Sequence, residues 1–318
     1  MEIIENISFD NLDVILKRPG IEAEHLDGTI KNIIQRVMTS GDEALKELTK
    51  KFDQVILDDL LVSRQEIEAS SLNVSTQQKT AIRKAQANIE LFHSRQKKET
   101  LKVETMPGVN CWRKSVPIQK VGLYIPGGTA PLFSTVLMLG IPAKIAGCKE
   151  IVLCTPPDIN GDIHPAILYT AQLVGIDTII KVGGAQAIAA LAYGTESVPR
   201  VDKIFGPGNQ YVTKAKQMVN LSGTAIDMPA GPSEVAVIAD GAADAEFIAA
   251  DLLSQAEHGE DSQVILISTS HELVTKVNSA MDEQLKLLPR KEVAINCLSN
   301  SKAILASDMQ EVIAISNA

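Results

Sequence analysis

The hydrophobic and polar positions of the chain follow two different patterns. From Ile21 to Phe52 and again from Ser75 to Gln96, apolar residues recur every three or four positions, with an interruption at residues 40–42. This period predicts amphipathic helices. Residues 1–20, which end in Pro-Gly, are interpreted as a separate N-terminal arm with a short helix, and a polar connection follows residue 96.

From Lys120 onward, short aliphatic or β-branched runs alternate with glycine-containing turns and helix-length segments. The runs are Lys120–Ile125, Glu150–Thr155, Thr178–Val182, Asp202–Phe205, Glu234–Ala239 and Gln263–Ser268. This alternation is the signature of βαβ units and predicts parallel sheets with helices on their faces. Ligands of such sheets bind at the carboxyl ends of the strands, where the unusual sequence segments lie.

The predicted fold class is α/β, with two domains that each carry a parallel, incomplete Rossmann-like sheet. The first domain is expected to combine residues 21–123 with residues 235–318, and the inserted domain to cover residues 124–234. A length of 318 residues favours two domains over one core. With 45% hydrophobic but only 3% aromatic residues, the cores must consist of Val, Ile, Leu and Ala.

Charge and cysteine usage narrow the class of partner. The formal net charge of −9 opposes nucleic acid and anionic membranes as partners, because both require a basic surface, and favours a small-molecule substrate. The four cysteines are widely spaced, as expected for reduced thiols in the cytoplasm. The first residues lack the order of a signal peptide. Residues 121–143 carry no charge, but their prolines and glycines oppose a membrane helix.

Three glycine-containing turns follow successive predicted strands: IPGGTAP at 125–131, VGGAQA at 182–187 and FGPGNQY at 205–211. Glycine allows a ligand to approach the backbone, and the following helix N-termini offer free amide groups to phosphate or carboxylate. None is a complete GxGxxG, and each alone is interpretable as a structural turn. Three turns at neighbouring strand ends favour a nucleotide or another anionic ligand.

The segment DLLSQAEHGEDSQ, residues 251–263, places an amide and an imidazole three positions apart. On a helix, Gln255 and His258 would share one face, and Gly259 is the usual left-handed residue that ends a helix. The negative end of the helix dipole there would favour a bound cation. The alternative is that both side chains are ordinary polar residues of an amphipathic helix.

Two further segments allow more than one interpretation. The loop AIDMPAGPSEV, residues 225–235, could present the Ser233 hydroxyl to a polar substrate or serve as a crossover between domains. Cysteine thiols form thiohemiacetals with aldehydes. However, Cys148 and Cys154 lie in apolar surroundings that raise a thiol pKa and lower its reactivity.

Four long segments together resemble the histidinol dehydrogenase family: VGLYIPGGTAPLFSTVLM, VGGAQAIAALAYGTESVPRVDKIFGPGN, AIDMPAGPSEV and DLLSQAEHGEDSQ. The resemblance extends from the N-terminal arm to residue 318. It implies a zinc enzyme of histidine biosynthesis that oxidises L-histidinol through L-histidinaldehyde to L-histidine with two NAD molecules. It also implies a homodimer and an active site between the two domains.

The resemblance assigns roles to residues that match the family's motifs. Tyr124 of LYIPGG, Gln186 of VGGAQA and Asn209 of GPGN would bind NAD. Ser233 of AGPSE would bind substrate. Gln255 and His258 of SQAEHG would bind both zinc and substrate, and an amide oxygen and a neutral imidazole are acceptable zinc ligands.

The chain departs from the family pattern at its C-terminal end. The family's catalytic Glu-His pair and two further zinc ligands come after the region equivalent to residues 312–318. The resemblance therefore implies a C-terminally truncated and inactive form, since two ligands do not complete a zinc site and no general base is left. The alternative is a relative that binds NAD or another small molecule without catalysis.

Overall fold

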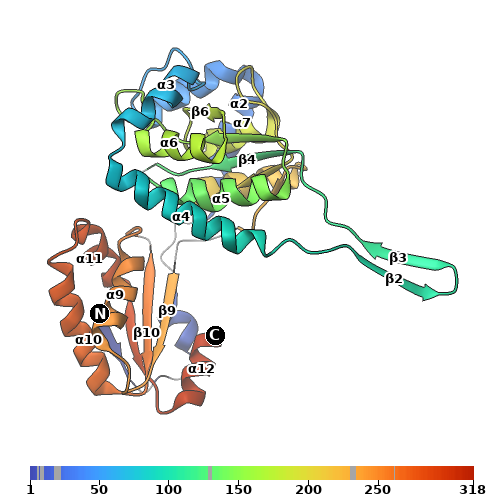
Figure 1. The fold of residues 1–318 in the computed structure, drawn as a ribbon. Coiled ribbons are helices and arrows are strands. Elements are labelled where there is room, and N and C mark those ends of the chain that lie inside the picture. The colour runs from blue at the N-terminus through green and yellow to red at the C-terminus, as the bar shows by residue number, and fades with distance from the viewer. Residues whose placement is uncertain (6, 8–10, 18–22, 128–130, 230–233, 261) are drawn as a thin grey trace. The chain divides into compact units, whose positions relative to one another are not determined.

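The chain, seen here in a computed structural model, forms two compact units. The structure describes residues 1–318 except 6, 8–10, 18–22, 128–130, 230–233 and 261 (Figure 1). Unit 1 consists of Met1–Glu22 and Ala230–Ala318, and unit 2 consists of Ala23–Pro229. Both units carry a parallel sheet with helices on its faces, which confirms the predicted α/β fold class.

Unit 2 contains a five-stranded parallel sheet with the strand order β6-β5-β4-β7-β8. The strands are β4 (Lys120–Tyr124), β5 (Glu150–Cys154), β6 (Thr178–Ile180), β7 (Lys203–Phe205) and β8 (Ala225–Ile226). Strand β4 lies in the middle, and its neighbours β5 and β7 come later in the chain. This order arises from crossovers on both sides of β4, which is the arrangement that creates a ligand site at the carboxyl edge.

Helices cover both faces of the unit 2 sheet because the strand side chains alternate between two buried clusters. Val121 and Leu123 pack with the helices of one face, whereas Tyr124 and Val152 pack with those of the other. The first face carries α5 (Phe133–Ala146) and α6 (Pro165–Val174), with α3 (Arg64–Ser70), the short 3-10 helix Ser71–Asn73 and α4 (Thr76–Ser94) outside them. The second face carries α7 (Gly184–Tyr193), α8 (Gln210–Leu221) and α2 (Ala23–Phe52).

The division into units differs from the predicted domains. Residues 23–123 belong to unit 2, not to a domain shared with residues 235–318. The reason is visible in the core, where Leu45 and Leu48 of α2 are buried in the same cluster as Leu191 of α7. The helical pattern predicted α2 itself and the interruption at residues 40–42, where Gly41 has a φ of 48°. The pattern does not reveal which sheet such a helix covers.

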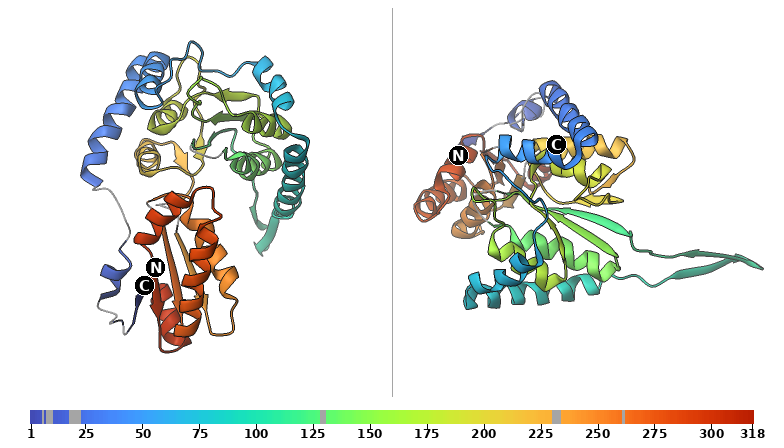
Figure 2. Two further views of the ribbon diagram at one scale, coloured as in Figure 1. Left: turned by 90° about the vertical axis from the view of Figure 1, so that its left-hand side faces the viewer. Right: turned by 90° about the horizontal axis from the view of Figure 1, so that it is seen from above.

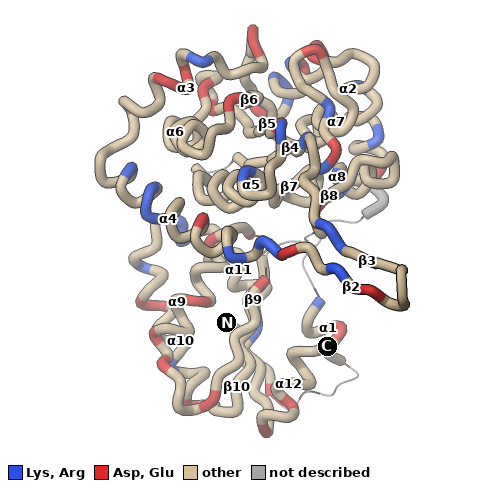
Figure 3. The backbone as a smooth tube through the Cα atoms, turned by 45° about the vertical axis from the view of Figure 1, so that its right-hand side comes forward, with Lys and Arg blue, Asp and Glu red and all other residues tan. Residues whose placement is uncertain are grey.

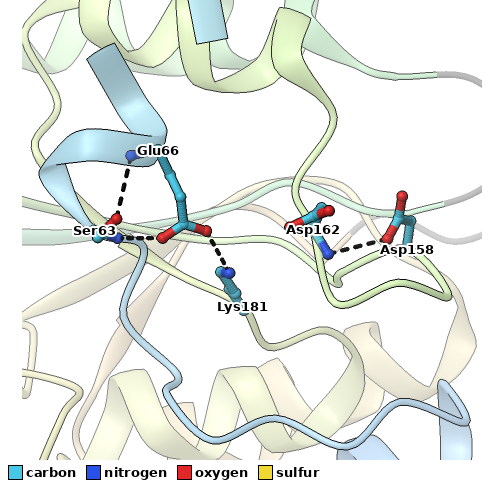
Figure 4. Close-up of polar contacts among 5 residues, drawn as sticks. All are labelled: Ser63, Glu66, Asp158, Asp162 and Lys181. Carbon is cyan, nitrogen blue, oxygen red and sulfur yellow. Dashed lines mark hydrogen bonds and ion pairs between the residues drawn. The ribbon is translucent and has the colours of Figure 1, made fainter. Parts of the chain in front are cut away.

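A polar cluster fixes α3 to the end of β6 (Figure 4). The Lys181 ammonium forms an ion pair with the Glu66 carboxylate at 2.5 Å, and Lys181 is 9% exposed. Ser63 caps α3 by accepting from the Glu66 amide, and the Glu66 side chain accepts from the Ser63 amide. Nearby, the Asp162 amide donates to the Asp158 carboxylate at 3.0 Å. These contacts order the turns on that side of the sheet.

A two-stranded hairpin extends from unit 2, formed by β2 (Leu101–Met106) and β3 (Val109–Arg113) (Figures 1 and 2). The sequence pattern predicted only a polar connection here. All residues of both strands are exposed. Gly108 has a φ of 82°, which allows the tight turn that joins the strands.

Unit 1 contains a four-stranded parallel sheet with the order β1-β11-β10-β9. The strands are β1 (Glu2–Ile4), β11 (Lys302–Leu305), β10 (Gln263–Ser268) and β9 (Glu234–Ala239). One buried cluster joins the sheet to α9 (Ala245–Ala256), α10 (His271–Leu285) and α11 (Lys291–Ser299). A second joins it to α1 (Leu12–Ile15) and α12 (Met309–Asn317).

The N-terminal arm therefore contributes a strand as well as the expected short helix, because β1 pairs with β11. None of the helices in the described part of the chain is long and apolar enough to cross a membrane.

Candidate functional site

The predicted cofactor residues of unit 2 gather at the carboxyl edge of its sheet. Tyr124 is the last residue of β4 and is 4% exposed. Its hydroxyl accepts a hydrogen bond from the Gly184 amide at 3.0 Å, which joins it to the N-terminal end of α7. Its own hydroxyl hydrogen can therefore point to an acceptor on a ligand.

Gln186 lies in the first turn of α7 and is 2% exposed. Its carboxamide folds over Gly184, because a Cβ atom at Gly184 would lie 2.8 Å from Gln186 Oε1. Gly184 also has a φ of 66°, so the position favours glycine both for its conformation and for space. Gln186 and Tyr124 thus meet at the same backbone turn.

Asn209 caps the N-terminus of α8, with its side-chain oxygen accepting from the Val212 amide at 3.1 Å. The side chain is exposed, and the oxygen's role in the cap leaves its amide hydrogens as the outward groups. The preceding turn closes on Tyr124: Gly206 has a φ of 133°, and a Cβ atom there would lie 2.1 Å from the Tyr124 carbonyl oxygen. The structure therefore brings Tyr124, Gln186 and the GPGN turn together.

A buried ion pair holds the GPGN turn in place. Lys216 of α8, 4% exposed, pairs with Asp227, which follows β8, and donates to the Gly206 carbonyl at 2.8 Å. Asp227 in turn accepts from the Gly206 amide at 2.8 Å. Both backbone groups of Gly206 are therefore fixed by one charged pair. The sequence pattern gave no signal for Lys216.

Asp53 is a second acidic residue near this edge that sequence reasoning missed. Its Oδ2 atom is buried and has no hydrogen-bond partner among the described residues, and burial raises the pKa of its carboxyl. Burial, opposed by the bond from Gly184 and reinforced by the charge of Asp53, raises the pKa of Tyr124 to about 12. The available signal was a carboxylate just after the C-terminal end of α2, where the helix dipole disfavours negative charge.

The remaining predicted residues belong to unit 1 or lie outside the described residues. Ser233 is not described, but it directly precedes Glu234, the first residue of β9. Glu234 pairs in register with Gln263, the first residue of β10. Helix α9 runs back from the end of β9 to the start of β10, so Gln255 and His258 also lie at this amino edge of the sheet. Gln255 and His258 therefore do not lie at the carboxyl ends of the strands, where the sequence predicted the ligand sites.

The local structure around the pair differs from the expectation. Helix α9 ends at Ala256 with Glu257 as its C-terminal cap, so His258 lies in the turn beyond the helix. The His258 amide donates to the Gln255 carbonyl at 3.1 Å, which closes that turn. Gly259 lies two residues beyond this cap, so it does not hold the position of the left-handed residue that ends a helix. Glu257 ends the helix in a right-handed conformation instead.

Gln255 and His258 fit half of a metal site. The Gln255 side-chain amide contains a buried nitrogen without a hydrogen-bond partner among the described residues, and a half-turn of the amide would place its oxygen there. The His258 side chain is exposed. No group of three or more His, Cys, Asp or Glu residues within the described ranges is arranged to hold a metal ion. The two donors suit zinc chemically, but a catalytic zinc site takes three protein ligands.

The cysteines are poorly suited to nucleophilic catalysis. Cys154 is fully buried and Cys148 is partly buried. Burial raises the pKa of both thiols, which lowers the fraction of reactive thiolate. This opposes the thiol mechanism considered from the sequence.

Comparison with known proteins gives one consistent family. The model of the family described as histidinol dehydrogenase matches residues 16–318. Histidinol dehydrogenase of Bacteroides thetaiotaomicron is 58% identical over 318 residues, which cover 100% of this chain and 74% of the relative. The Vibrio parahaemolyticus enzyme is 53% identical over 316 residues, covering 98% of this chain and 72% of the relative.

A solved structure agrees with these sequence matches. The crystal structure of histidinol dehydrogenase from Elizabethkingia anophelis superimposes with a TM-score of 0.94 at 52% identity. The alignment covers 100% of this chain and 73% of that chain. The similarity therefore extends over both units of the fold.

Proposed function

The chain belongs to the histidinol dehydrogenase family, and we propose that it serves the oxidation of L-histidinol through L-histidinaldehyde to L-histidine with two NAD molecules. The observation that supports this most directly is the hydrogen bond between the Tyr124 hydroxyl and the Gly184 amide, beside the GPGN turn. It places a rigid set of donors where a parallel sheet of this order binds its ligand.

In this proposal the unit 2 residues orient the dinucleotide. Tyr124 stays a neutral phenol at physiological pH, since its pKa is about 12, and donates its hydroxyl hydrogen to the cofactor. Buried Gln186 presents an amide from the first turn of α7, and Asn209 presents the amide hydrogens that its cap does not use. Because packing or hydrogen bonds restrain each group before the cofactor arrives, little side-chain entropy is lost on binding.

In unit 1, Ser233, Gln255 and His258 are proposed to bind the substrate, with Gln255 and His258 also as zinc ligands. Zinc would supply a Lewis acid that positions the imidazole and amine of histidinol, and NAD would accept the hydride. The chain's own contribution here is to hold one amide oxygen and one imidazole nitrogen at the amino edge of the unit 1 sheet.

We further propose that the polypeptide of residues 1–318 alone has no turnover. The two oxidation steps each release a proton, and the second also requires attack of water on the aldehyde carbon, so both need a general base. In the family that base belongs to a Glu-His pair beyond the region matched by residue 318. Gln255 and His258 would then be a pair of ligands without the rest of their coordination sphere.

Turnover measurements test the activity. We expect no NADH formation from L-histidinol with residues 1–318, and NADH formation with a form extended through the Glu-His segment. An extended form that reduces no NAD in the presence of zinc would refute the assignment. Zinc content is measured in parallel, so that a failure to load metal is distinguished from a failure of the residues present.

Calorimetry separates the catalytic proposal from a relative that only binds. Residues 1–318 should bind NAD, and Tyr124→Phe should weaken that binding by about tenfold, the value of one lost hydrogen bond. Tyr193→Phe, at the far end of α7, serves as the matched control and should bind NAD normally. A non-catalytic relative would saturate with ligand in its extended form yet yield no NADH.

A further inference from the structure

Asp53 carries a half-buried carboxyl group that no cation among the described residues offsets. It directly follows the last residue of α2. Its Oδ2 atom is buried and has no hydrogen-bond partner among the described residues. Burial alone raises its pKa, whereas a neighbouring cation would lower it. A buried carboxyl without partners costs stability, so its presence needs a reason other than the fold.

Other acidic groups of unit 2 are neutralised by cations. Asp227 pairs with Lys216 and fixes the GPGN turn. Helix α3 carries acidic and basic residues together (Figure 3), and its Glu66 pairs with Lys181. Asp53 differs from both because its negative charge is uncompensated within the described part of the chain. The charge is therefore available to act on a ligand that lies next to it.

The charge of Asp53 already acts on Tyr124, one of the proposed cofactor residues. Burial is the main cause of the raised pKa of Tyr124, and the charge of Asp53 adds to it. Leu48 and Val55, on either side of Asp53 in sequence, are buried in the same cluster as Tyr124. Since the Tyr124 hydroxyl accepts from the Gly184 amide, Asp53 lies beside the part of the proposed cofactor surface that the start of α7 forms.

A nicotinamide dinucleotide offers parts of opposite charge to such a surface. Its phosphates are negative, whereas its nicotinamide ring carries a positive charge in NAD and none in NADH. The amides at a helix N-terminus normally attract phosphate, but an uncompensated carboxylate beside α7 repels it and attracts the oxidised ring. The start of α7 therefore suits the nicotinamide. The start of α8, where Lys216 neutralises Asp227, suits the phosphates.

We propose that Asp53 faces the nicotinamide ring of the bound cofactor and makes the site prefer NAD over NADH. This inference rests on the proposed cofactor site at Tyr124, Gln186 and Asn209. In that function the first oxidation leaves NADH at the site, and a second NAD has to replace it before the aldehyde is oxidised. A charge that stabilises the oxidised ring but not the reduced ring favours this exchange, because preference is a difference between two affinities.

Asp53→Asn tests the charge with little change in shape. Calorimetry measures the affinity for NAD, for NADH and for ADP-ribose, which has the same phosphates but no nicotinamide ring. We expect the ratio of NAD to NADH affinity to fall by roughly tenfold, the effect of one charge several ångströms away in a partly solvated site. The ratio of NADH to ADP-ribose affinity should stay unchanged, since neither ligand carries the positive ring.

Asp59→Asn is the matched control, because it removes the same charge from an exposed residue of the same segment. It should leave all three affinities unchanged. Urea unfolding of both variants separates binding from folding, and Asp53→Asn should not lower the unfolding midpoint, because a neutral amide costs less to bury than a carboxylate. Asp53→Ser, a smaller neutral replacement, should change the ratio of NAD to NADH affinity in the same direction.

Two outcomes would overturn this proposal and leave the cofactor site intact. A wild-type ratio of NAD to NADH affinity in Asp53→Asn would mean that the nicotinamide ring does not lie near the carboxylate. Equal losses for NAD, NADH and ADP-ribose would mean that Asp53 supports the fold of the site or contacts another part of the dinucleotide. A wild-type protein that binds none of the three ligands would instead refute the cofactor site itself, and this proposal with it.

Discussion

The two units prepare their candidate residues in opposite ways. In unit 2, Tyr124 and Gln186 are buried, and hydrogen bonds within the chain hold Tyr124, the Gly206 turn and Asn209 in place. In unit 1, the buried side-chain nitrogen of Gln255 has no hydrogen-bond partner among the described residues, and His258 is exposed in a turn. The surface proposed for the cofactor is therefore preorganised, whereas the pair proposed for the metal has donor groups that no contact among the described residues uses.

Gly206→Ala should cause the largest loss of stability among the changes in unit 2. The new Cβ would lie 2.1 Å from the Tyr124 carbonyl oxygen at a φ of 133°, so we expect a loss of roughly 3 kcal/mol or more in unfolding free energy. Gly223→Ala is the control, because its φ is 102° but nothing lies within 4 Å; it should cost about 1–2 kcal/mol. Urea unfolding measures both, and equal losses would contradict the close-approach argument.

Asp227→Ala should cause the second largest loss of stability, because it leaves the buried Lys216 charge without its partner. We expect a loss of roughly 2–3 kcal/mol and weaker NAD binding, since the Gly206 turn is released. The double variant Asp227→Ala with Lys216→Met should recover part of the stability but not the NAD affinity. Glu272→Ala, which breaks an exposed ion pair in unit 1, should leave the unfolding midpoint unchanged.

Gln255→Leu should not destabilise the fold, in contrast to the two unit 2 variants. It tests whether the Gln255 amide in unit 1 lacks a partner. Without metal it should leave the stability unchanged or raise it by about 1 kcal/mol, because an unpaired buried amide is removed. Any rise in melting temperature on adding zinc should disappear. Gln284→Leu is the matched control: its amide donates to the Glu246 carbonyl at 3.0 Å, so its loss should destabilise the fold. Destabilisation by both variants would indicate a structural Gln255.

Acidification should give the smallest effect, at the Lys181–Glu66 pair of unit 2. Burial raises the pKa of Glu66, but hydrogen bonds from Lys181 and Ser63 outweigh it and lower that pKa below its usual 4.5. A lowered folded pKa means stability that is present above pH 4.5 and is lost as the pH falls through the folded value. Since Glu66 is 36% exposed, we expect Glu66→Gln to cost less than about 1 kcal/mol at pH 7.

The same variant gives the sign of the pH effect. The difference in unfolding free energy between the wild type and Glu66→Gln should shrink below pH 4.5, measured by urea unfolding across a pH series. A difference that grows on acidification would mean that Glu66 is not stabilised as a carboxylate.

Much of the fold could be predicted because most strands of the two parallel sheets are short apolar runs between turn residues. The runs Glu234–Ala239 and Gln263–Ser268 have the bounds that the structure shows, since an apolar run between turn residues has few other interpretations. The short strands β1 and β11 were missed, because three or four residues carry little pattern. The hairpin was missed because its charged residues mask the alternation of Leu101 and Val103.

The candidate site was predictable where chemistry is local in sequence. The glycine turns pointed to the carboxyl edge of β4, and Tyr124 does meet Gly184 there. The role of Lys216 could not be predicted, because it depends on which helix packs over which strand. The grouping of residues 23–123 failed for the same reason. The roles assigned to all six candidate residues stay predictions: Tyr124, Gln186, Asn209, Ser233, Gln255 and His258.

The pairing of β1 with β11 also sets an order of events during synthesis on the ribosome. Glu2 lies in register with Lys302, so β1 has no partner strand until β11 has been synthesised. Unit 2 is one uninterrupted stretch and can fold as soon as it emerges. Strand β1 therefore stays unpaired until β11 has emerged, and in that period chaperones or other exposed strand edges can compete for it.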